Sequence, residues 1–328
     1  MDLEALELER VKIEKKKIRK PAYGERKRLE NLPNIPSLEF KEVIGQGHFS
    51  RVFYGLYEKK PVAIKMIERG SEKLVASEIR ILQTLKGHPN IVQLENVFQS
   101  DNTILVFEYI KGISENDLYL SLTRQRIRVI LKCLLNGILH AQKRNVVHRD
   151  IKLGNILITS NIDRAVLIDW GCSTIVSDSM SSVAGSRNVR SPEMLLGYKN
   201  YGFGCDIWAI GVLLLTLLTE GSNVFKERTS TDVLVKMSSV WGSEPFINLM
   251  NDYNMNDSNM IIPKLQKDPS TTLSSLFTQK MKDNVITPSL LDLLDRLLCI
   301  DPRNRITAED ALKHRFFKKK VMIHKRSV

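Results

Sequence analysis

Three side chains that can carry out phosphoryl-transfer chemistry lie close together in His148-Arg149-Asp150-Ile151-Lys152-Leu153-Gly154-Asn155. The Asp150 carboxylate can accept the proton of a substrate hydroxyl. The Lys152 ammonium can reach a phosphate group during its transfer, and Asn155 can hold a Mg²⁺ ion from the same loop. The spacing therefore predicts one reaction centre. The alternative interpretation is a charged surface turn after a helix.

A second oxygen ligand for the metal is predicted at Asp169. This residue follows the apolar stretch 165–168, which has the pattern of a buried strand. Mg²⁺ is rarely held by protein ligands alone and usually keeps waters or phosphate oxygens in its coordination shell. Asp169 would therefore hold the Mg²⁺ ion that bridges the β- and γ-phosphates, and Asn155 would serve a second ion site.

A glycine-rich segment between two predicted strands is the candidate for binding those phosphates. Glycine lets backbone N–H groups approach a phosphate without an intervening Cβ atom. The sequence Val62-Ala63-Ile64-Lys65 follows on a later strand, and Lys65 can pair there with the α- and β-phosphates. The predicted phosphate-binding residues of the glycine-rich segment are Gly45, Gln46, Gly47, His48, Phe49, Ser50, Arg51 and Val52.

Lys65 needs a carboxylate partner to fix its position. Glu78 is the preferred candidate because it falls on a predicted helix, 71–85, that packs beside the strand. Glu72, earlier on the same helix, is the alternative. The predicted catalytic residues are Lys65, Glu78, Asp150 and Lys152.

The apolar pattern changes at about residue 110. Before that point, short strands separated by Gly and Pro predict a small, mostly antiparallel sheet with one helix. After it helical spacing dominates, and the apolar run 207–218 predicts a buried helix too short to cross a membrane. The polar stretch 251–282 predicts an irregular connection. The predicted strands are 42–44, 51–56, 62–67, 92–99 and 103–109, and the predicted helices are 71–85, 118–122, 127–143, 206–219, 229–241, 288–298 and 308–312.

The order and spacing of these segments resemble the protein kinases. Ser191-Pro192-Glu193 lies where that family closes its activation segment, and Arg305 is the expected ion-pair partner of Glu193. The resemblance implies an α+β fold with two lobes, a small antiparallel β-sheet lobe with one main helix and a larger, mostly helical lobe. We predict a charged N-terminal leader at 1–36, the small lobe at 37–110, the large lobe at 111–317 and a basic C-terminal tail at 318–328.

The composition is typical of a globular protein, and the net charge favours an acidic partner. The chain has 328 residues, of which 43% are hydrophobic and 26% charged, which is usual for a globular domain. Its four cysteines are far apart and predict neither a disulfide framework nor a zinc site. The net charge of +12 favours an acidic partner. The basic blocks 12–28 and 313–326 carry no nucleic-acid signature, so we expect protein substrates rather than nucleic acid or a membrane.

Among the kinases, the chain resembles the catalytic (alpha) subunit of casein kinase II over about residues 40–317. Asp169-Trp170-Gly171 has Trp where most kinases have Phe, as in that family. Gly47-His48-Phe49-Ser50-Arg51-Val52-Phe53 shares its Ser in place of a third glycine, and Leu105-Val106-Phe107-Glu108-Tyr109 is similar to its hinge. The cell-division-control-seven family also has this Ser but keeps Phe after the metal-binding Asp, so Trp170 argues against that alternative.

The resemblance implies ATP and Mg²⁺ as cofactors and leaves the use of GTP open. Backbone groups of Glu108 and Ile110 would meet the base. The implied adenine pocket consists of Ile44, Val52, Ala63, Phe107, Leu157 and Ile168.

The resemblance also implies transfer of phosphate to Ser or Thr followed by acidic residues. Arg187 and Arg190 occupy the matching basic positions, and Arg80 is a further candidate for charge-assisted hydrogen bonds to acidic side chains. The alternative is that the arginines of the activation segment anchor that segment. The stretch 68–74 is less basic than in the family, and Val183 stands at a third basic position, so a weaker acid preference is expected.

Control of the activity is left open by the sequence. In the family a leader braces the activation segment, and Pro21 and Tyr23 are the candidates for that role here. A phosphate on a hydroxyl residue of the activation segment could be bound by the Arg149 guanidinium. The candidate residues are Ser173, Thr174, Ser177, Ser179, Ser181 and Ser182. The resemblance implies a dimeric regulatory (beta) subunit on the outer face of the small lobe, and we expect a nuclear and cytoplasmic location. A pseudokinase scaffold is the remaining alternative, and it is disfavoured because every catalytic residue type is present.

Overall fold

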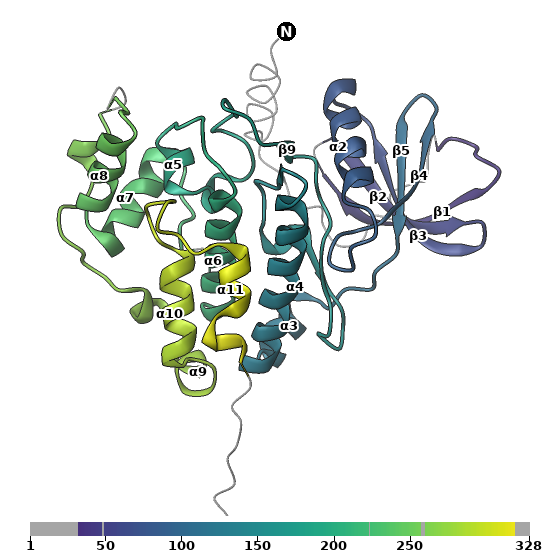
Figure 1. Cartoon of the computed structure of the whole chain (residues 1–328). Coiled ribbons are helices and arrows are strands. Elements are labelled where there is room, and N and C mark those ends of the chain that lie inside the picture. Colours follow the sequence, from purple (N-terminus) through teal and green to yellow (C-terminus); the bar gives the residue numbers. More distant parts are fainter. Residues whose placement is uncertain (1–31, 48, 223, 257–259, 319–328) are drawn as a thin grey trace, which may run out of the picture.

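A computed structural model describes residues 32–47, 49–222, 224–256 and 260–318. These residues form two lobes, one built on a β-sheet and one mostly helical, which is the α+β fold expected (Figure 1). In this part of the chain no helix is long and apolar enough to cross a membrane. The expectations for Pro21, Tyr23, His48 and the tail residues 319–328 fall outside the described residues.

The small lobe is an antiparallel five-stranded sheet in the order β1-β2-β3-β5-β4. Side chains on β3 alternate: Val62, Ile64 and Met66 are buried in a core that includes the sheet face opposite Lys65. This period of two places Lys65 on the face toward the rest of the molecule. The strands are β1 (Leu38–Gln46), β2 (Ser50–Tyr57), β3 (Lys60–Ile67), β4 (Leu94–Gln99) and β5 (Thr103–Glu108).

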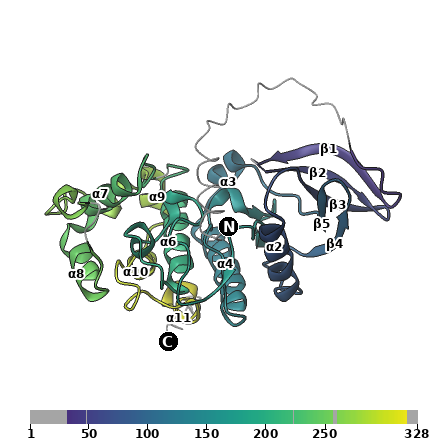
Figure 2. The same cartoon turned by 90° about the horizontal axis from the view of Figure 1, so that it is seen from above.

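One long helix, α2 (Glu72–Thr84), belongs to the small lobe. It lies between the sheet and the helices of the large lobe in both views (Figures 1 and 2). Ile81 and Leu82 are buried in the main core, and Glu78, which is one helical turn earlier, is buried with them. The helix therefore presents Glu78 to the sheet while Glu72 stays exposed at its first turn.

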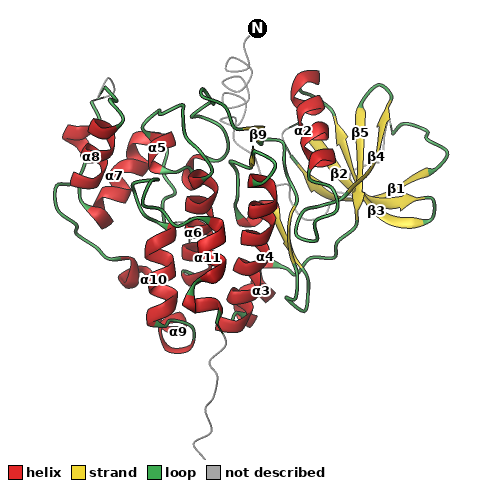
Figure 3. Ribbon diagram, in the orientation of Figure 1, coloured by secondary structure: helices red, strands yellow, loops and turns green. Residues whose placement is uncertain are grey.

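The large lobe is built around α6 (Gly204–Leu218), which is buried along almost its whole length. Helix α4 (Arg124–Gln142) packs beside it, and the colouring by secondary structure separates this helical lobe clearly from the sheet (Figure 3). The other helices are α3 (Glu115–Ser121), α5 (Pro192–Leu195), α7 (Ser230–Trp241), α8 (Glu244–Asp252), α9 (Gln279–Asn284), α10 (Pro288–Leu297) and α11 (Ala308–Lys313).

Two short two-stranded ladders frame the loops that carry the polar residues. Strand β6 (Val146–Val147) pairs with β9 (Thr174–Ile175), and β7 (Ile156–Ile158) pairs with β8 (Ala165–Leu167). The segment 148–155, called the catalytic loop below after the resemblance to kinases, therefore runs from the end of β6 to the start of β7, while Asp169 follows β8. One ladder lies at each end of the catalytic loop and pairs it with an end of the segment that carries Asp169. The two segments therefore lie side by side.

Helix α8 was not predicted, and α9 begins inside the stretch 251–282 that was expected to be irregular and ends two residues after it. Phe246, Leu249 and Met250 give α8 a buried stripe at helical spacing. The stripe covers little more than two turns, which is too short for a periodic pattern to stand out from the surrounding polar sequence. The rest of 260–278 is mostly turns and 3₁₀ segments, as expected.

Candidate active site

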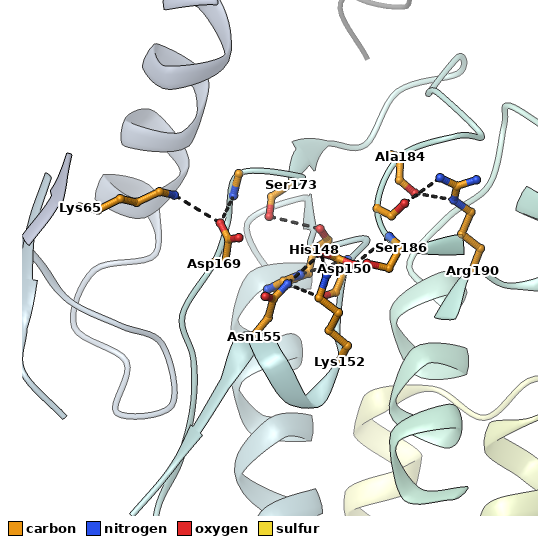
Figure 4. Close-up of polar contacts among 12 residues, drawn as sticks. Lys65, His148, Asp150, Lys152, Asn155, Asp169, Ser173, Ala184, Ser186 and Arg190 are labelled. Atoms are coloured by element: carbon orange, nitrogen blue, oxygen red, sulfur yellow. Dashed lines mark hydrogen bonds and ion pairs between the residues drawn. The ribbon is translucent and has the colours of Figure 1, made fainter. Parts of the chain in front are cut away.

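Asp150 is the centre of a network of hydrogen bonds within the catalytic loop (Figure 4). Its Oδ2 accepts from Lys152 Nζ at 2.8 Å and from Asn155 Nδ2 at 2.8 Å. Its Oδ1 accepts from the backbone N–H of Ser186 at 2.8 Å. Lys152 Nζ also donates to Ser186 Oγ at 2.6 Å. The carboxylate is therefore fixed in orientation by its own loop and by the activation segment.

The ionised form of Asp150 is favoured by its neighbours. Burial alone would raise the pKa of this carboxyl, but the Lys152 ammonium and the hydrogen bonds from Lys152 and Ser186 outweigh burial and lower it. The same pairing raises the pKa of Lys152 despite burial. At neutral pH the pair is thus a carboxylate beside an ammonium group.

Asp206, at the start of α6, binds the backbone of the catalytic loop. Its two carboxylate oxygens accept the backbone N–H groups of His148 and Arg149, each at 2.8 Å. Arg149 has a φ of 68°, a left-handed conformation that costs a residue with a Cβ about 1–2 kcal/mol. The two hydrogen bonds from this loop offset that strain. The sequence alone indicated Asp206 only as the beginning of a buried helix, and its contact with the catalytic loop was missed.

Lys65 pairs with Glu78 rather than with Glu72. Its Nζ lies 2.6 Å from Glu78 Oε1 and 3.4 Å from Asp169 Oδ1. Burial disfavours the charged lysine, but the two carboxylates outweigh burial and raise the pKa of Lys65. The three residues come from β3, α2 and the segment after β8, so this cluster joins the two lobes.

Asn155 and Asp169 suit a hard cation. The Asn155 amide nitrogen donates to the backbone oxygen and to Oδ2 of Asp150, so its remaining polar atom is an oxygen acceptor. The Asp169 side chain is 46% exposed, and its Oδ1 accepts from Gly171 N at 3.2 Å. Two oxygen donors of this kind can share a Mg²⁺ ion with phosphate oxygens.

Trp170 is a structural residue of the site. It is fully buried, and its ring lies 4.6 Å from that of His148. Its Nε1 donates to the Leu167 carbonyl at 3.4 Å. Burial lowers the pKa of His148, so this imidazole is neutral at pH 7. The indole therefore packs the segment that carries Asp169 onto the catalytic loop without adding charge.

Five of the predicted adenine-pocket residues lie on strands of the two lobes, and the sixth, Ile168, directly follows β8. Val52 and Ala63 lie on β2 and β3, which pair directly, and Ala63 lies opposite Phe107 on β5. Ala63, Leu157 and Ile168 pack against the main core but stay partly exposed, and Ile44 on β1 is 46% exposed. These six side chains are Ile44, Val52, Ala63, Phe107, Leu157 and Ile168. All are apolar, which suits a flat aromatic base.

The hinge after β5 is held by a polar contact that the sequence did not indicate. The Glu108 carboxylate pairs with Arg164 at 3.2 Å and accepts the backbone N–H of Gln93 at 3.1 Å. The backbone N–H of Glu108 donates to Gln93 O at 3.1 Å. Because the Glu108 N–H is already bonded, the Glu108 carbonyl is the candidate for a hydrogen bond to a nucleotide base. Ile110, the other predicted hinge residue, is buried.

The glycine-rich segment forms the turn between β1 and β2. Gly47 N donates to Ser50 O at 2.8 Å, which closes that turn. Gly45 and Gln46 end β1, opposite Val52 and Arg51. The Arg51 guanidinium pairs with Glu68 and stacks over Phe53 at 5.4 Å. The Arg51 side chain is therefore held by Glu68 and Phe53. Phe49, within the turn, accepts from Glu68 and Arg69 through its backbone oxygen.

The three arginines predicted to read acidic substrates differ in exposure. Arg80 is exposed on α2. Arg187 is partly exposed, and its Nη1 donates to Arg228 O at 2.6 Å. Arg190 is buried, and its guanidinium donates to Ala184 O at 2.9 Å and to Gly185 O at 2.7 Å. Arg190 thus braces the activation segment, which is the alternative that the sequence left open, and its contact with acidic substrate residues stays a prediction.

Two further sets of contacts hold the activation segment. Glu193 and Arg305 form a buried bidentate pair, with both N–O distances at 2.9 Å, as expected from the sequence. Ser186 was missed. It holds both Asp150 and Lys152, and its only sequence signal was a hydroxyl residue shortly before Ser191-Pro192-Glu193.

Comparison with known proteins agrees with this geometry. The protein kinase domain family matches residues 38–317. The chain belongs to the protein kinase domain family. It is similar to a probable serine/threonine-protein kinase of Dictyostelium discoideum, with 29% identity over 299 residues that cover 88% of this chain and 49% of the relative. The chain therefore spans about half the length of that relative. Kinase domains use ATP and Mg²⁺ and are transferases, which fits the residues assembled here.

Proposed function

We propose that this chain is a protein serine/threonine kinase of the casein-kinase-II type, which transfers the γ-phosphate of ATP to Ser or Thr near acidic residues. The observation that carries the activity is the arrangement around Asp150: a carboxylate fixed by Lys152, Asn155 and Ser186. The subtype is supported by the Trp170 and Ser50 positions in the sequence.

Each residue has a defined role in this proposal. Asp150 orients the substrate hydroxyl and accepts its proton, and Lys152 neutralises charge on the phosphate in transfer. Lys65, held by Glu78, binds the α- and β-phosphates of ATP. Mg²⁺, held by Asn155 and Asp169, would neutralise the phosphate oxygens. The use of GTP in place of ATP stays a question for nucleotide competition.

The acid preference rests on fewer arginines than the sequence suggested. Arg187 is partly exposed beside the segment that carries Ser186, and Arg80 is exposed on α2. Arg190 is occupied by carbonyl oxygens of the activation segment. We therefore assign the contact with acidic substrate residues to Arg187 first and to Arg80 second, and we expect a moderate preference.

The test is phosphate transfer from ATP with Mg²⁺ by the full chain after phosphatase treatment. Two peptides with one serine each would be compared, one followed by Asp and Glu and one by Lys and Arg. We expect the acidic peptide to be preferred. Asp150→Asn should lower the rate about 10²- to 10⁴-fold, the usual contribution of a general base. The exposed Asp163→Asn, in the β7–β8 turn, is the matched control.

Specificity is tested separately from activity. Arg187→Ala should raise KM for the acidic peptide about tenfold, the size of a lost charged hydrogen bond, and leave the basic peptide unchanged. Arg296→Ala, an exposed arginine on α10, is the control. Equal use of both peptides by the unaltered chain would contradict the casein-kinase-II type and favour another kinase specificity. Full transfer by Asp150→Asn would contradict the mechanism.

A regulatory partner and a location follow from the same resemblance. We propose that a dimeric regulatory (beta) subunit binds the outer face of the small-lobe sheet. Phe40, Tyr57 and Phe98 pack there on the second hydrophobic core and remain partly exposed. We also propose a nuclear and cytoplasmic location.

A further inference from the structure

Arg149 lies where the catalytic loop meets the activation segment, and its guanidinium contacts protein groups of that segment. Its Nε donates to the Cys172 carbonyl at 2.7 Å, and its Nη1 lies 3.2 Å from the Tyr201 hydroxyl oxygen. The Arg149 side chain is buried. A buried guanidinium needs acceptors for its N–H groups, and here a phenol supplies one of them.

The same phenol contacts the activation segment. Tyr201 Oη donates to the Ser181 carbonyl at 2.6 Å. One hydroxyl group therefore accepts from Arg149 and donates to Ser181, and it connects the catalytic loop to the segment that precedes Ser186. Tyr201 is buried beside Val147 and Cys205, which fixes the position of its ring.

The backbone carbonyls between Ser181 and Ser186 are held by a second side chain, that of Arg190. Arg190 donates to the carbonyls of Val183, Ala184 and Gly185. Gly185 has a φ of 69°, and a Cβ at this position would lie 2.0 Å from the Arg149 carbonyl oxygen. The activation segment thus packs directly on Arg149, with its carbonyls held by Tyr201 and Arg190.

This arrangement reaches the reacting groups. The segment continues to Ser186, whose N–H donates to Asp150 Oδ1 at 2.8 Å and whose hydroxyl accepts from Lys152. A shift of the segment would therefore move two of the groups that orient the Asp150 carboxylate. Misplacement of a reacting group by about 1 Å can lower a rate about 10²-fold.

We propose that Tyr201 is a positioning residue, whose hydroxyl bridges Arg149 to the activation segment and supports catalysis without a phosphate group on that segment. In this arrangement the Tyr201 hydroxyl makes a contact with Arg149 of the kind that a phosphoserine oxygen would make. The serines of 177–182 then need no modification for basal activity. The kinetic part of this proposal rests on the proposed kinase function.

The test compares the full chain, Tyr201→Phe and the control Tyr198→Phe, each treated with phosphatase. Tyr201→Phe keeps the ring and removes only the hydroxyl. Tyr198 is three residues away, and its ring packs on Tyr253 at 4.5 Å. We expect Tyr201→Phe to lower kcat about tenfold, with KM for ATP and the melting temperature close to those of the control. Amide hydrogen exchange in 180–186 should become faster in Tyr201→Phe alone.

A double variant shows whether Tyr201 acts through Arg149. If it does, Arg149→Met with Tyr201→Phe should be no slower than Arg149→Met alone, because effects within one bridge are not additive. Independent, additive losses would overturn the bridge. Unchanged kcat and unchanged exchange in Tyr201→Phe would overturn the positioning role.

Experiments on the unaltered chain decide whether the activation segment must be phosphorylated for activity. Activity that survives phosphatase treatment supports the proposal. Activity that appears only after phosphorylation within 177–182 would overturn it, because Arg149 would then receive a phosphate. Absence of transfer to any peptide under either condition would contradict the proposed kinase function. In that case the exchange rates of 180–186 would still decide whether the Tyr201 hydroxyl holds the segment.

Discussion

Two ion pairs, one in each half of the molecule, have similar distances and different surroundings. Glu193 and Arg305 meet inside the large lobe at 2.9 Å, with side chains that are 1% and 0% exposed. Lys65 and Glu78 meet between β3 and α2 at 2.6 Å, with side chains that are 17% and 7% exposed. The first pair lies between elements of one lobe, and the second reaches a carboxylate of the other lobe, Asp169.

The surroundings decide what each pair does. Arg305 also donates to the carbonyls of Cys299, Gly204 and Ile300, and it lies 5.2 Å from the ring centre of Trp208. Its charge is fully enclosed by acceptors, so the pair holds one arrangement of the fold. Lys65 keeps access to solvent and to a ligand. The comparison indicates that the enclosed pair serves stability, whereas the partly exposed pair leaves Lys65 available for the phosphate-binding role proposed above.

The largest effect on stability is expected for Arg305→Ala. The substitution leaves the Glu193 carboxylate buried without its partner, which costs about 3–5 kcal/mol. Chemical denaturation should show this loss in the free energy of unfolding. Arg296→Ala, whose exposed pair with Asp292 lies at 3.2 Å, is the control and should change the midpoint little. An Arg305→Ala protein as stable as its control would contradict the structural role of the buried pair.

The second prediction concerns activity and uses two glutamates of the same helix. Glu78→Gln removes the charge that fixes Lys65 and should lower kcat/KM about 10²-fold, as for the loss of one preorganised electrostatic contact. Glu72→Gln, at the exposed first turn of α2, should leave kcat/KM unchanged. The melting temperature of Glu72→Gln should stay near that of the unaltered chain, whereas that of Glu78→Gln should fall because Lys65 loses one of its two carboxylate partners. Equal kinetic losses in the two variants would remove the distinction between the pairs.

The smallest expected effect concerns a neutral contact between the lobes. His88, between α2 and β4, stacks on His140 of α4 with ring centres 4.6 Å apart. Burial first, and then His140 and Arg144, lower the pKa of His88 to about 4 from 6.5. The unfolded chain therefore binds a proton more readily between these values, so this contribution to stability is present above pH 6.5 and is lost as the pH falls toward 4.

Denaturation of the full chain between pH 7.5 and 4.5 measures this effect. His88→Asn removes the titrating ring and should make the loss of stability toward acid shallower. Parallel curves for the two proteins would show that the contact between the lobes carries no proton-linked stability.

The residues of the site were largely predictable because their chemistry is local in sequence. The loop of Asp150, Lys152 and Asn155 is a single segment, and Glu78 differs from Glu72 by helical position alone. The arginines were harder to place. Arg187 and Arg190 are close in sequence, and the path of the chain around Gly185 decides that one is partly exposed and the other caps carbonyl groups. Periodicity carries no signal for such an irregular path.

By itself, the sequence determined which side chains can react and which elements carry them, because residue types and apolar periods are properties of short segments. It determined the small sheet, the helix of Glu78 and the acidic and basic groups around Asp150. Only the tertiary structure decided the contacts of Ser186, Asp206 and Tyr201, which join segments far apart in the chain. Those contacts depend on the packing of the two lobes and on the backbone conformation of Arg149 and Gly185, and no local pattern encodes them.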